Sequence, residues 1–189
     1  KSRTGSRGIG AFALRQRDGS LEGRMLDGRP LKSAEAAMTA LHTMLAKDDV
    51  LVQPHLANHP LLKRATSSGD AAILRITTRR RQEGADILAA FLRLPIRVQA
   101  RERVAVIDVV ARVDPETGVI TRNPDSVLAL LPQTSLLEDR VFQQLPEETA
   151  VPFWPEIVAQ SRHAQAEFAG LWAIGWDWIV SANGPFLLE

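Results

Sequence analysis

Runs of aliphatic and β-branched residues, each bounded by turn-forming residues, place the strongest limit on what this chain can fold into. Residues 71–81 and 103–113 have this composition, and residues 175–189 read as two short strands around a turn. Residues 85–94 fit either a further strand or a short helix. Strand runs joined by short turns are typical of antiparallel sheets, so the sequence predicts a mainly antiparallel sheet.

A hairpin and a helix are predicted before these strands. Asp18-Gly19 forms a favourable two-residue turn between two short strand-like runs. Ser33 is a suitable N-cap for a helix over residues 34–49, in which apolar residues recur at helical spacing.

A second helix is expected over residues 154–170, with Gly170 at its end. Residues 57–70 read as a polar connector, and residues 124–151 read as loop-rich. Helices combined with antiparallel strands give the predicted fold class, α+β.

Composition argues against several classes of function. The net charge is +1, from 23 basic and 22 acidic residues, which is not typical of a polyanion binder. Aromatic residues make up 5% and there is no Tyr, so we expect no nucleic-acid partner. The absence of Cys excludes disulfides and thiolate metal sites, and the 4 His residues lack the spacing of a zinc site.

The length of 189 residues fits one domain or two small lobes. No apolar run approaches the roughly 20 residues that span a bilayer, so we expect a cytoplasmic protein without a membrane span. The chain has no initiator Met and begins on Lys1, and we expect it to be an excerpt from a longer protein.

The closing strands carry two acidic residues whose relative position depends on the turn between them. With a three-residue loop of Ala182, Asn183 and Gly184, Asp177 lies directly opposite Glu189 on one face of the hairpin. Gly184 suits the left-handed position at the end of such a loop, whereas a two-residue loop of Asn183-Gly184 separates the acids onto opposite faces. Paired carboxylates suit Mg²⁺, and the alternative is two surface acids that do not meet.

Arg75 lies in a strand-like run and shares one face with Ile73 and Thr77. A guanidinium on a sheet surface needs an anionic partner, which is either a bound phosphate or a nearby acidic side chain. The stretch "GIGAFA" fits a dinucleotide-binding pattern, but a strand and turn follow it instead of a helix, so we reject that interpretation.

Five segments in order resemble the ATP-grasp superfamily over nearly the whole chain. They are Lys1 with "GSRGIG", then "VLVQPHL", "LRITT", "VPFWPEIVAQSRHA" and the closing "IGWDWIV…GPFLLE". The last two are similar in particular to the sugar-transfer-associated ATP-grasp group, which is related to α-L-glutamate-ligase-like proteins. The resemblance implies two lobes of one domain, with residues 1–49 as the smaller lobe and residues 50–189 as the larger lobe.

The resemblance also implies the role of each site residue and the cofactors ATP and Mg²⁺. Arg75 is the catalytic residue that binds the γ-phosphate or an acyl phosphate, and Asp177 and Glu189 bind the metal. The family's third metal ligand is an Asn two residues after this Glu, beyond the last residue of the chain. The residues implied to contact ATP are Lys1, Gly5, Gly8, Gly10, Gln53, Pro54 and Leu56.

The implied function is the ATP-binding part of a carboxylate–amine ligase that acts through an acyl phosphate. Its substrates are small or peptide-like carboxylates and amines. The alternative is a non-catalytic ATP-binding or regulatory module associated with surface-polysaccharide assembly. Related sequences carry an Asp-Asn and a Gly-Gly pair near the acceptor site, and residues 97–118 of this chain lack them.

Overall fold

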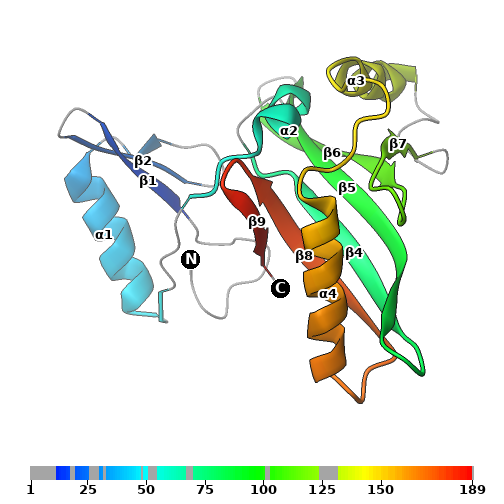
Figure 1. Ribbon diagram of the computed structural model, residues 1–189. Coiled ribbons are helices and arrows are strands. Elements are labelled where there is room, and N and C mark those ends of the chain that lie inside the picture. Colours follow the sequence, from blue (N-terminus) through cyan, green and yellow to red (C-terminus); the bar gives the residue numbers. More distant parts are fainter. Residues whose placement is uncertain are drawn as a thin grey trace. The chain divides into compact units, whose positions relative to one another are not determined.

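A computed structural model gives the fold, shown in Figure 1. The chain divides into two compact units, Lys1–His55 and Leu56–Glu189, called the smaller and the larger unit below. The structure describes residues 12–17, 20–25, 30–31, 33–47, 49–50, 55–66, 70–100, 103–123 and 132–188.

The smaller unit contains a three-stranded antiparallel sheet and one helix. Its strands are β1 (Phe12–Arg17), β2 (Ser20–Met25) and β3 (Pro30–Leu31), in that order across the sheet. Strands β1 and β2 form the predicted hairpin, with Arg17 paired to Ser20.

The helix of the smaller unit, α1 (Ala34–Leu45), begins as predicted. The Ser33 hydroxyl accepts a hydrogen bond from the Ala36 N–H at 3.1 Å, which satisfies one of the free donors of the first turn. Ala37 is buried, and α1 contacts β2 and β3.

The larger unit contains a six-stranded sheet in which every neighbouring pair is antiparallel, as the sequence predicts. The strand order is β7-β6-β5-β4-β8-β9. The ambiguous residues 85–94 are strand, part of the 16-residue β5. The bounds are β4 (Ile73–Arg80), β5 (Ala85–Ala100), β6 (Arg103–Val113), β7 (Ile120–Arg122), β8 (Ala173–Ser181) and β9 (Gly184–Leu187).

Three helices belong to the larger unit: α2 (Pro60–Ala65), α3 (Pro132–Gln143) and α4 (Trp154–Glu167). The first two correct the prediction of a connector and a loop-rich region. His59 caps α2 by accepting a hydrogen bond from the Leu61 N–H at 3.3 Å. The helix α4 confirms the second predicted helix, although it ends at Glu167 and not at Gly170.

One face of the larger sheet is buried under these helices. Strand residues alternate between the two faces, so every second residue of each strand points to this side. Figure 1 shows α4 running across the sheet, and α4 contacts β4, β5 and β8. The inward residues are almost fully buried: Leu74, Ile76, Leu92, Leu94, Val109, Ala111, Val113, Trp176, Trp178 and Val180.

Both tryptophans of β8 point into this core, and each indole N–H has a partner. Trp178 donates to the Ser161 hydroxyl of α4 at 3.1 Å. Trp176 donates to the Thr78 hydroxyl at 2.7 Å, and Thr78 donates to the Gln165 side chain of α4 at 2.6 Å. These bonds fix α4 on the sheet.

The turn between β8 and β9 differs from the predicted one. Ser181 pairs with Gly184, so the loop has two residues, Ala182 and Asn183, and the predicted three-residue loop is wrong. The Ser181 hydroxyl closes the turn: it accepts from the Asn183 N–H at 3.0 Å and donates to the Gly184 carbonyl at 2.9 Å. Gly184 has a positive φ of 121°, as predicted for it, but as the first residue of β9.

Candidate functional site

The candidate site lies on the polar face of the larger sheet, which we define as the side carrying Arg75, Arg93, Asp108 and Asp177. Arg75 on β4 lies directly between Phe91 on β5 and Asp177 on β8. Because side chains alternate along a strand, these three residues point to the same side, away from the buried core.

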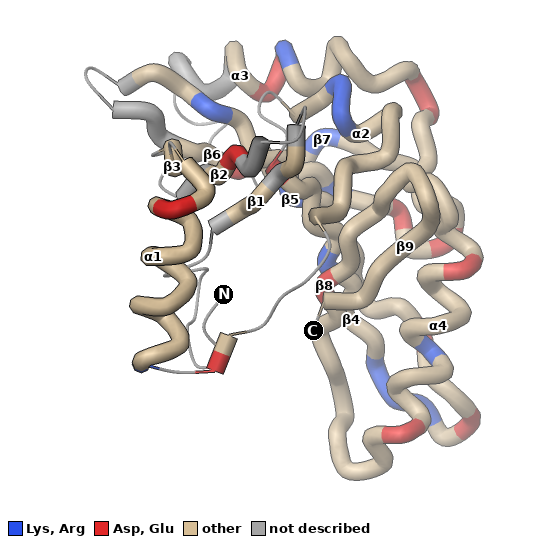
Figure 2. The backbone as a smooth tube through the Cα atoms, turned by 90° about the vertical axis from the view of Figure 1, so that its left-hand side faces the viewer, with Lys and Arg blue, Asp and Glu red and all other residues tan. Residues whose placement is uncertain are grey.

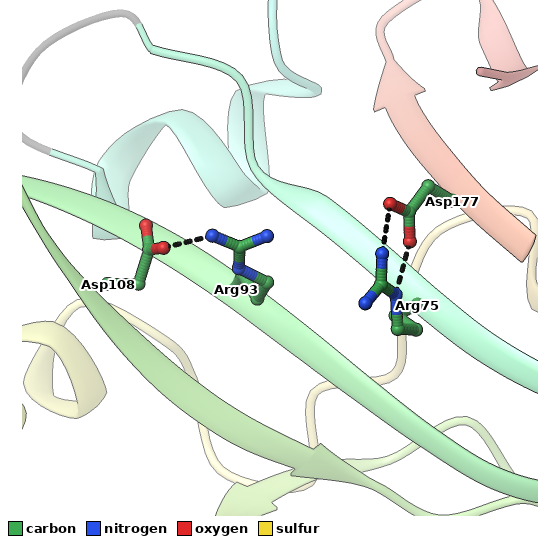
Figure 3. A network of polar contacts seen from close by, with 4 residues as sticks. All are labelled: Arg75, Arg93, Asp108 and Asp177. Carbon is green, nitrogen blue, oxygen red and sulfur yellow. Dashed lines mark hydrogen bonds and ion pairs between the residues drawn. The ribbon is translucent and has the colours of Figure 1, made fainter. Parts of the chain in front are cut away.

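Arg75 and Asp177 form a two-pronged ion pair (Figure 3). Arg75 Nε donates to Asp177 Oδ1 at 2.6 Å, and Nη2 donates to Oδ2 at 2.5 Å. The Asp177 side chain is 8% exposed, whereas that of Arg75 is 51% exposed. The carboxylate therefore depends on a cationic partner, while the Arg75 side chain is half-exposed to solvent.

Arg93 and Asp108 form a second ion pair on the neighbouring strands β5 and β6 (Figure 3). Both side chains are partly exposed, at 41% for Arg93 and 33% for Asp108. We did not predict this pair from the sequence. The available signal was one charged residue within an apolar stretch of each strand: Arg93 within "FLRLPI" of β5 and Asp108 within "VIDVV" of β6.

The family of the chain follows from a comparison with known families. A profile of the family described as sugar-transfer associated ATP-grasp matches residues 3–189. The chain belongs to this family. Comparisons with curated proteins and with solved structures gave no significant match.

Membership of an ATP-grasp family implies that the chain binds ATP. The predicted resemblance is therefore confirmed at the level of the family, and the α+β class with antiparallel sheets agrees with it. Within the part of the chain that is described, no helix is long and apolar enough to cross a membrane.

The structure describes three of the predicted ATP-grasp site residues. It brings Arg75 and Asp177 together on one sheet face, and it places Leu56, which is half-buried, at the start of the larger unit. The other predicted residues lie outside the described residues: Lys1, Gly5, Gly8, Gly10, Gln53, Pro54 and Glu189.

The register of β8 and β9 bears on the predicted pairing of the two acids. The Leu188 N–H donates to the Asp177 carbonyl at 2.8 Å, so Leu188 occupies the backbone position opposite Asp177. The turn argument that placed Glu189 there no longer holds, because the loop is one residue shorter than predicted. A metal-binding role for Glu189 stays a prediction from the family resemblance.

The described residues do not form a complete magnesium site. They contain no group of three or more His, Asp or Glu side chains that could hold a metal ion. Both oxygens of Asp177 accept hydrogen bonds from Arg75. The arrangement fits an ion pair, and Asp177 could bind a metal only after this pair opened.

Proposed function

We propose that this ATP-grasp chain is the ATP-binding part of a ligase that joins a carboxylate to an amine. In the first step a carboxylate oxygen attacks the γ-phosphorus of ATP, the bond to the β,γ-bridging oxygen breaks, and ADP leaves. In the second step the amine nitrogen attacks the carbonyl carbon of the acyl phosphate, and inorganic phosphate leaves. The pairing of Arg75 with Asp177 on the polar face is the observation that supports this proposal.

Arg75 is proposed to bind the transferred phosphoryl group. Its guanidinium is half-exposed, always charged, and has a fork geometry that matches two phosphate oxygens. Fixed positive charge next to the transferred group stabilises the charge of the transition state. The remaining ATP contacts are proposed for the glycines of the N-terminal loop, Lys1, and the backbone of Pro54 and Leu56.

Mg²⁺ is proposed to be held by Asp177 and Glu189, and when bound it would neutralise charge on the phosphates. In the described state Arg75 takes the place of that cation. Binding of ATP with Mg²⁺ would then exchange partners, with Arg75 moving to phosphate and Asp177 to the metal. Each of the two charged side chains would remain paired with a group of opposite charge throughout such an exchange, which avoids the cost of a buried, unpaired carboxylate.

A second candidate function is a non-catalytic ATP-binding or regulatory module associated with surface-polysaccharide assembly. The same ion pair supports it, because Arg75 and Asp177 neutralise each other. The sugar-transfer association in the family description is compatible with this role.

Calorimetry with ATP and Mg²⁺ tests ATP binding, which both candidate functions require. Arg75→Gln is expected to weaken ATP binding by about tenfold or more, because a charge-assisted hydrogen bond is lost. Arg162→Gln is the matched control, since Arg162 is an exposed arginine of α4, on the side of the sheet opposite the polar face. An unchanged affinity in Arg75→Gln would remove Arg75 from the ATP site.

Hydroxylamine trapping separates the two candidates. An acyl phosphate reacts with hydroxylamine to give a hydroxamate, so a ligase supplied with ATP, Mg²⁺ and a panel of amino acids and dicarboxylates should form one. We expect hydroxamate and ADP in equal amounts with at least one acid of the panel, and neither in Arg75→Gln. ATP binding without ADP formation across the panel would favour the regulatory module.

A further inference from the structure

A separate cavity of about 510 Å³ lies where β5 runs on beyond the start of β4. The pairing of β4 with β5 begins at Ile73 and Arg93, so the following residues of β5 pair with β6 on one side only. Helices α2 and α3 contact each other, and both line the cavity together with β5. The cavity volume lies within the range of about 300–1,000 Å³ that is usual for small-molecule sites.

Three arginines from three different elements line this cavity: Arg64 of α2, Arg97 of β5 and Arg140 of α3. Figure 2 shows basic positions along the tube of both α2 and α3. None of the described residues that line the cavity is acidic. The three side chains therefore bring positive charge to one concave surface.

Arg97 is held in place by Asp70. Its Nε and Nη2 donate to the two carboxylate oxygens at 3.0 and 2.9 Å. These hydrogen bonds raise the pKa of Arg97, which keeps the guanidinium charged and fixes its orientation.

Arg64 and Arg140 have no acidic partner among the described residues. Asp70 compensates one of the three positive charges, so two remain without an acidic partner in the described part of the chain. Like charges that converge on one surface repel each other, and an anion between them would reverse that repulsion.

The rest of the cavity wall is apolar. Ile96 and Val141 are buried, and Val98 and Leu137 are half-buried. Burying the hydrocarbon part of a ligand against such a wall is favourable, whereas a bare inorganic ion buries no apolar surface there. The wall thus fits a ligand with both an anionic group and a hydrocarbon part.

We propose that this cavity binds a small phosphorylated organic molecule, with its phosphate between Arg64, Arg97 and Arg140 and its carbon portion against Ile96 and Val141. A phosphate monoester offers three oxygens and close to two negative charges, which matches several guanidinium forks better than a single carboxylate does. The cavity lies beyond the start of β4 and shares no lining residue with the proposed ATP contacts, so it goes beyond the proposed ATP-binding function.

A calorimetric titration of the protein with phenyl phosphate at low ionic strength tests the proposal. Phenyl phosphate is expected to bind, and Arg64→Gln combined with Arg140→Gln is expected to weaken it by about tenfold or more, because two charge-assisted contacts are lost. Inorganic phosphate is expected to bind more weakly than phenyl phosphate because it lacks the hydrocarbon ring. Phenol is expected not to bind because it lacks the phosphate.

Two controls keep the test specific to this cavity. Arg162→Gln changes an exposed arginine of α4 that does not line the cavity, and it should leave phenyl phosphate binding unchanged. Arg75→Gln should also leave it unchanged, because Arg75 does not line the cavity. Loss of binding in Arg75→Gln, or full binding in the double variant, would overturn the proposal.

Thermal unfolding without ligand gives an independent check on folding. The double variant should melt at the same temperature as the unsubstituted protein or slightly above it, since removing uncompensated like charges relieves repulsion. No binding of phenyl phosphate at 10 mM to the unsubstituted protein would also refute the site.

Discussion

Gly118 closes the turn between β6 and β7 and lies directly against Trp154, the first residue of α4. Its φ is +75°, and a Cβ built on it would lie 2.4 Å from Cγ of Trp154. Both the backbone angle and the close contact therefore require glycine. Gly118→Ala is expected to lower the free energy of unfolding by about 3 kcal/mol or more, since overpacking and backbone strain each cost ~1–3 kcal/mol.

Gly84 provides the matched control for this prediction, which denaturant unfolding can measure. Its φ is +81°, and nothing lies within 4 Å of a Cβ built on it. Gly84→Ala should cost only the backbone strain, about 1 kcal/mol. Equal losses in the two variants would show that contact with Trp154 is not what excludes a side chain at position 118.

Asp114 stabilises the same turn in a manner that depends on pH. Its Oδ1 accepts hydrogen bonds from the Thr117 N–H at 2.7 Å, the Thr117 hydroxyl at 2.8 Å and the Glu116 N–H at 3.0 Å. These bonds, led by those from Thr117, lower the pKa of Asp114 below its ordinary value of 3.8. A lowered folded-state pKa means that the stabilisation is present above the unfolded pKa and is lost as pH falls through the folded pKa.

Asp114→Asn is therefore expected to lower the melting temperature at pH 7, where the wild-type carboxylate is charged. The difference between the two proteins should shrink below pH 3.8 as the wild-type residue protonates. Melting curves from pH 2 to pH 7 provide the measurement. A difference that stays constant across this range would contradict the electrostatic cause.

For individual residues, the sequence predicted the face of a strand on which a side chain lies better than it predicted which other side chain it contacts. Alternation predicted which residues within each strand share a face, and the family resemblance implied that Arg75 and Asp177 belong to one site; the structure has these two residues on one face of the sheet. An acidic side chain was one of the two partners predicted for Arg75. Which acidic residue it is depends on the strand order, because β4 and β8 are far apart in sequence. The pairing of Arg93 with Asp108 was missed for another reason: β5 and β6 are consecutive, but residues 85–94 fitted either a strand or a helix, so no register between the two strands was assigned.

Helix α4 is fixed to the sheet by a buried polar network centred on the Thr78 hydroxyl. This hydroxyl accepts from Trp176 and donates to Gln165, and Gln165 in turn donates to the Leu171 carbonyl at 3.1 Å. Thr78→Val keeps the shape of the side chain but leaves the Trp176 N–H and the Gln165 oxygen without this partner. The free energy of unfolding should fall by about 2 kcal/mol, because buried unsatisfied polar groups keep their desolvation cost.

Thr77→Val is the matched control for Thr78→Val, and denaturant unfolding is the measurement for both. Thr77 is the adjacent residue of β4, points to the other face and makes no side-chain hydrogen bond within the described residues. Its replacement should change the free energy of unfolding by no more than about 0.5 kcal/mol. Similar losses in the two variants would mean that the network contributes little.

The pairing of β4 with β8 leads to a prediction about ATP binding without metal. In the described state Arg75 is bonded to both oxygens of Asp177, so under the proposed function Asp177 would compete with phosphate for Arg75. Asp177→Asn keeps the side-chain shape and removes the charge, so it should strengthen binding of metal-free ATP by about three- to tenfold while it weakens the response to Mg²⁺. Calorimetry with ATP in EDTA measures the first effect.

The two outcomes of that experiment separate two roles of Asp177. If metal-free ATP binds equally well to both proteins, Asp177 does not restrain Arg75. If the response to Mg²⁺ is also unchanged, then Asp177 is not a metal ligand either.

Turn chemistry predicted the elements of the closing hairpin but not its register. Asn183 and Gly184 each suit a tight turn, and a glycine with positive φ can be placed either inside the loop or at the first paired position. The Ser181 hydroxyl decides between these options, because it bonds to both the Asn183 N–H and the Gly184 carbonyl. A turn that is closed by side-chain hydrogen bonds leaves no periodic pattern in the sequence, so the sequence did not indicate this one.

At the scale of the whole molecule, the larger unit contains its own hydrophobic core. Among the described residues, the buried cluster runs from Leu62 to Val180 in sequence and includes none of the smaller unit. A chain that begins at Leu56 is therefore expected to fold and to melt cooperatively by circular dichroism. Its affinity for ATP should fall by about tenfold or more, because the proposed contacts from the N-terminal loop and Lys1 are removed.

Two results would count against this description. Aggregation or non-cooperative melting of the shorter chain would mean that the larger unit needs the smaller one to fold. Undiminished ATP binding would mean that the smaller unit does not contribute to the nucleotide site as proposed.

The α+β class and the antiparallel sheet were predictable, because long β-branched runs and turn residues indicate them directly. Helix α2 was missed since it has only 6 residues, and α3 was missed since its sequence "PQTSLLEDRVFQ" alternates polar and apolar residues weakly. Both helices acquire their structure by packing on the sheet, and single-sequence patterns carry little information about such packing.

The larger sheet is longest at its centre and shortest at its borders. The outer strands β7 and β9 have 3 and 4 residues, whereas β5 has 16. Because β7 pairs only with residues 111–113, the outer edge of β6 over residues 103–110 has no paired strand among the described residues. An extended segment from another molecule could add hydrogen bonds along this Val- and Ile-rich stretch, and the charge of Asp108 within it is the kind of feature that discourages such association.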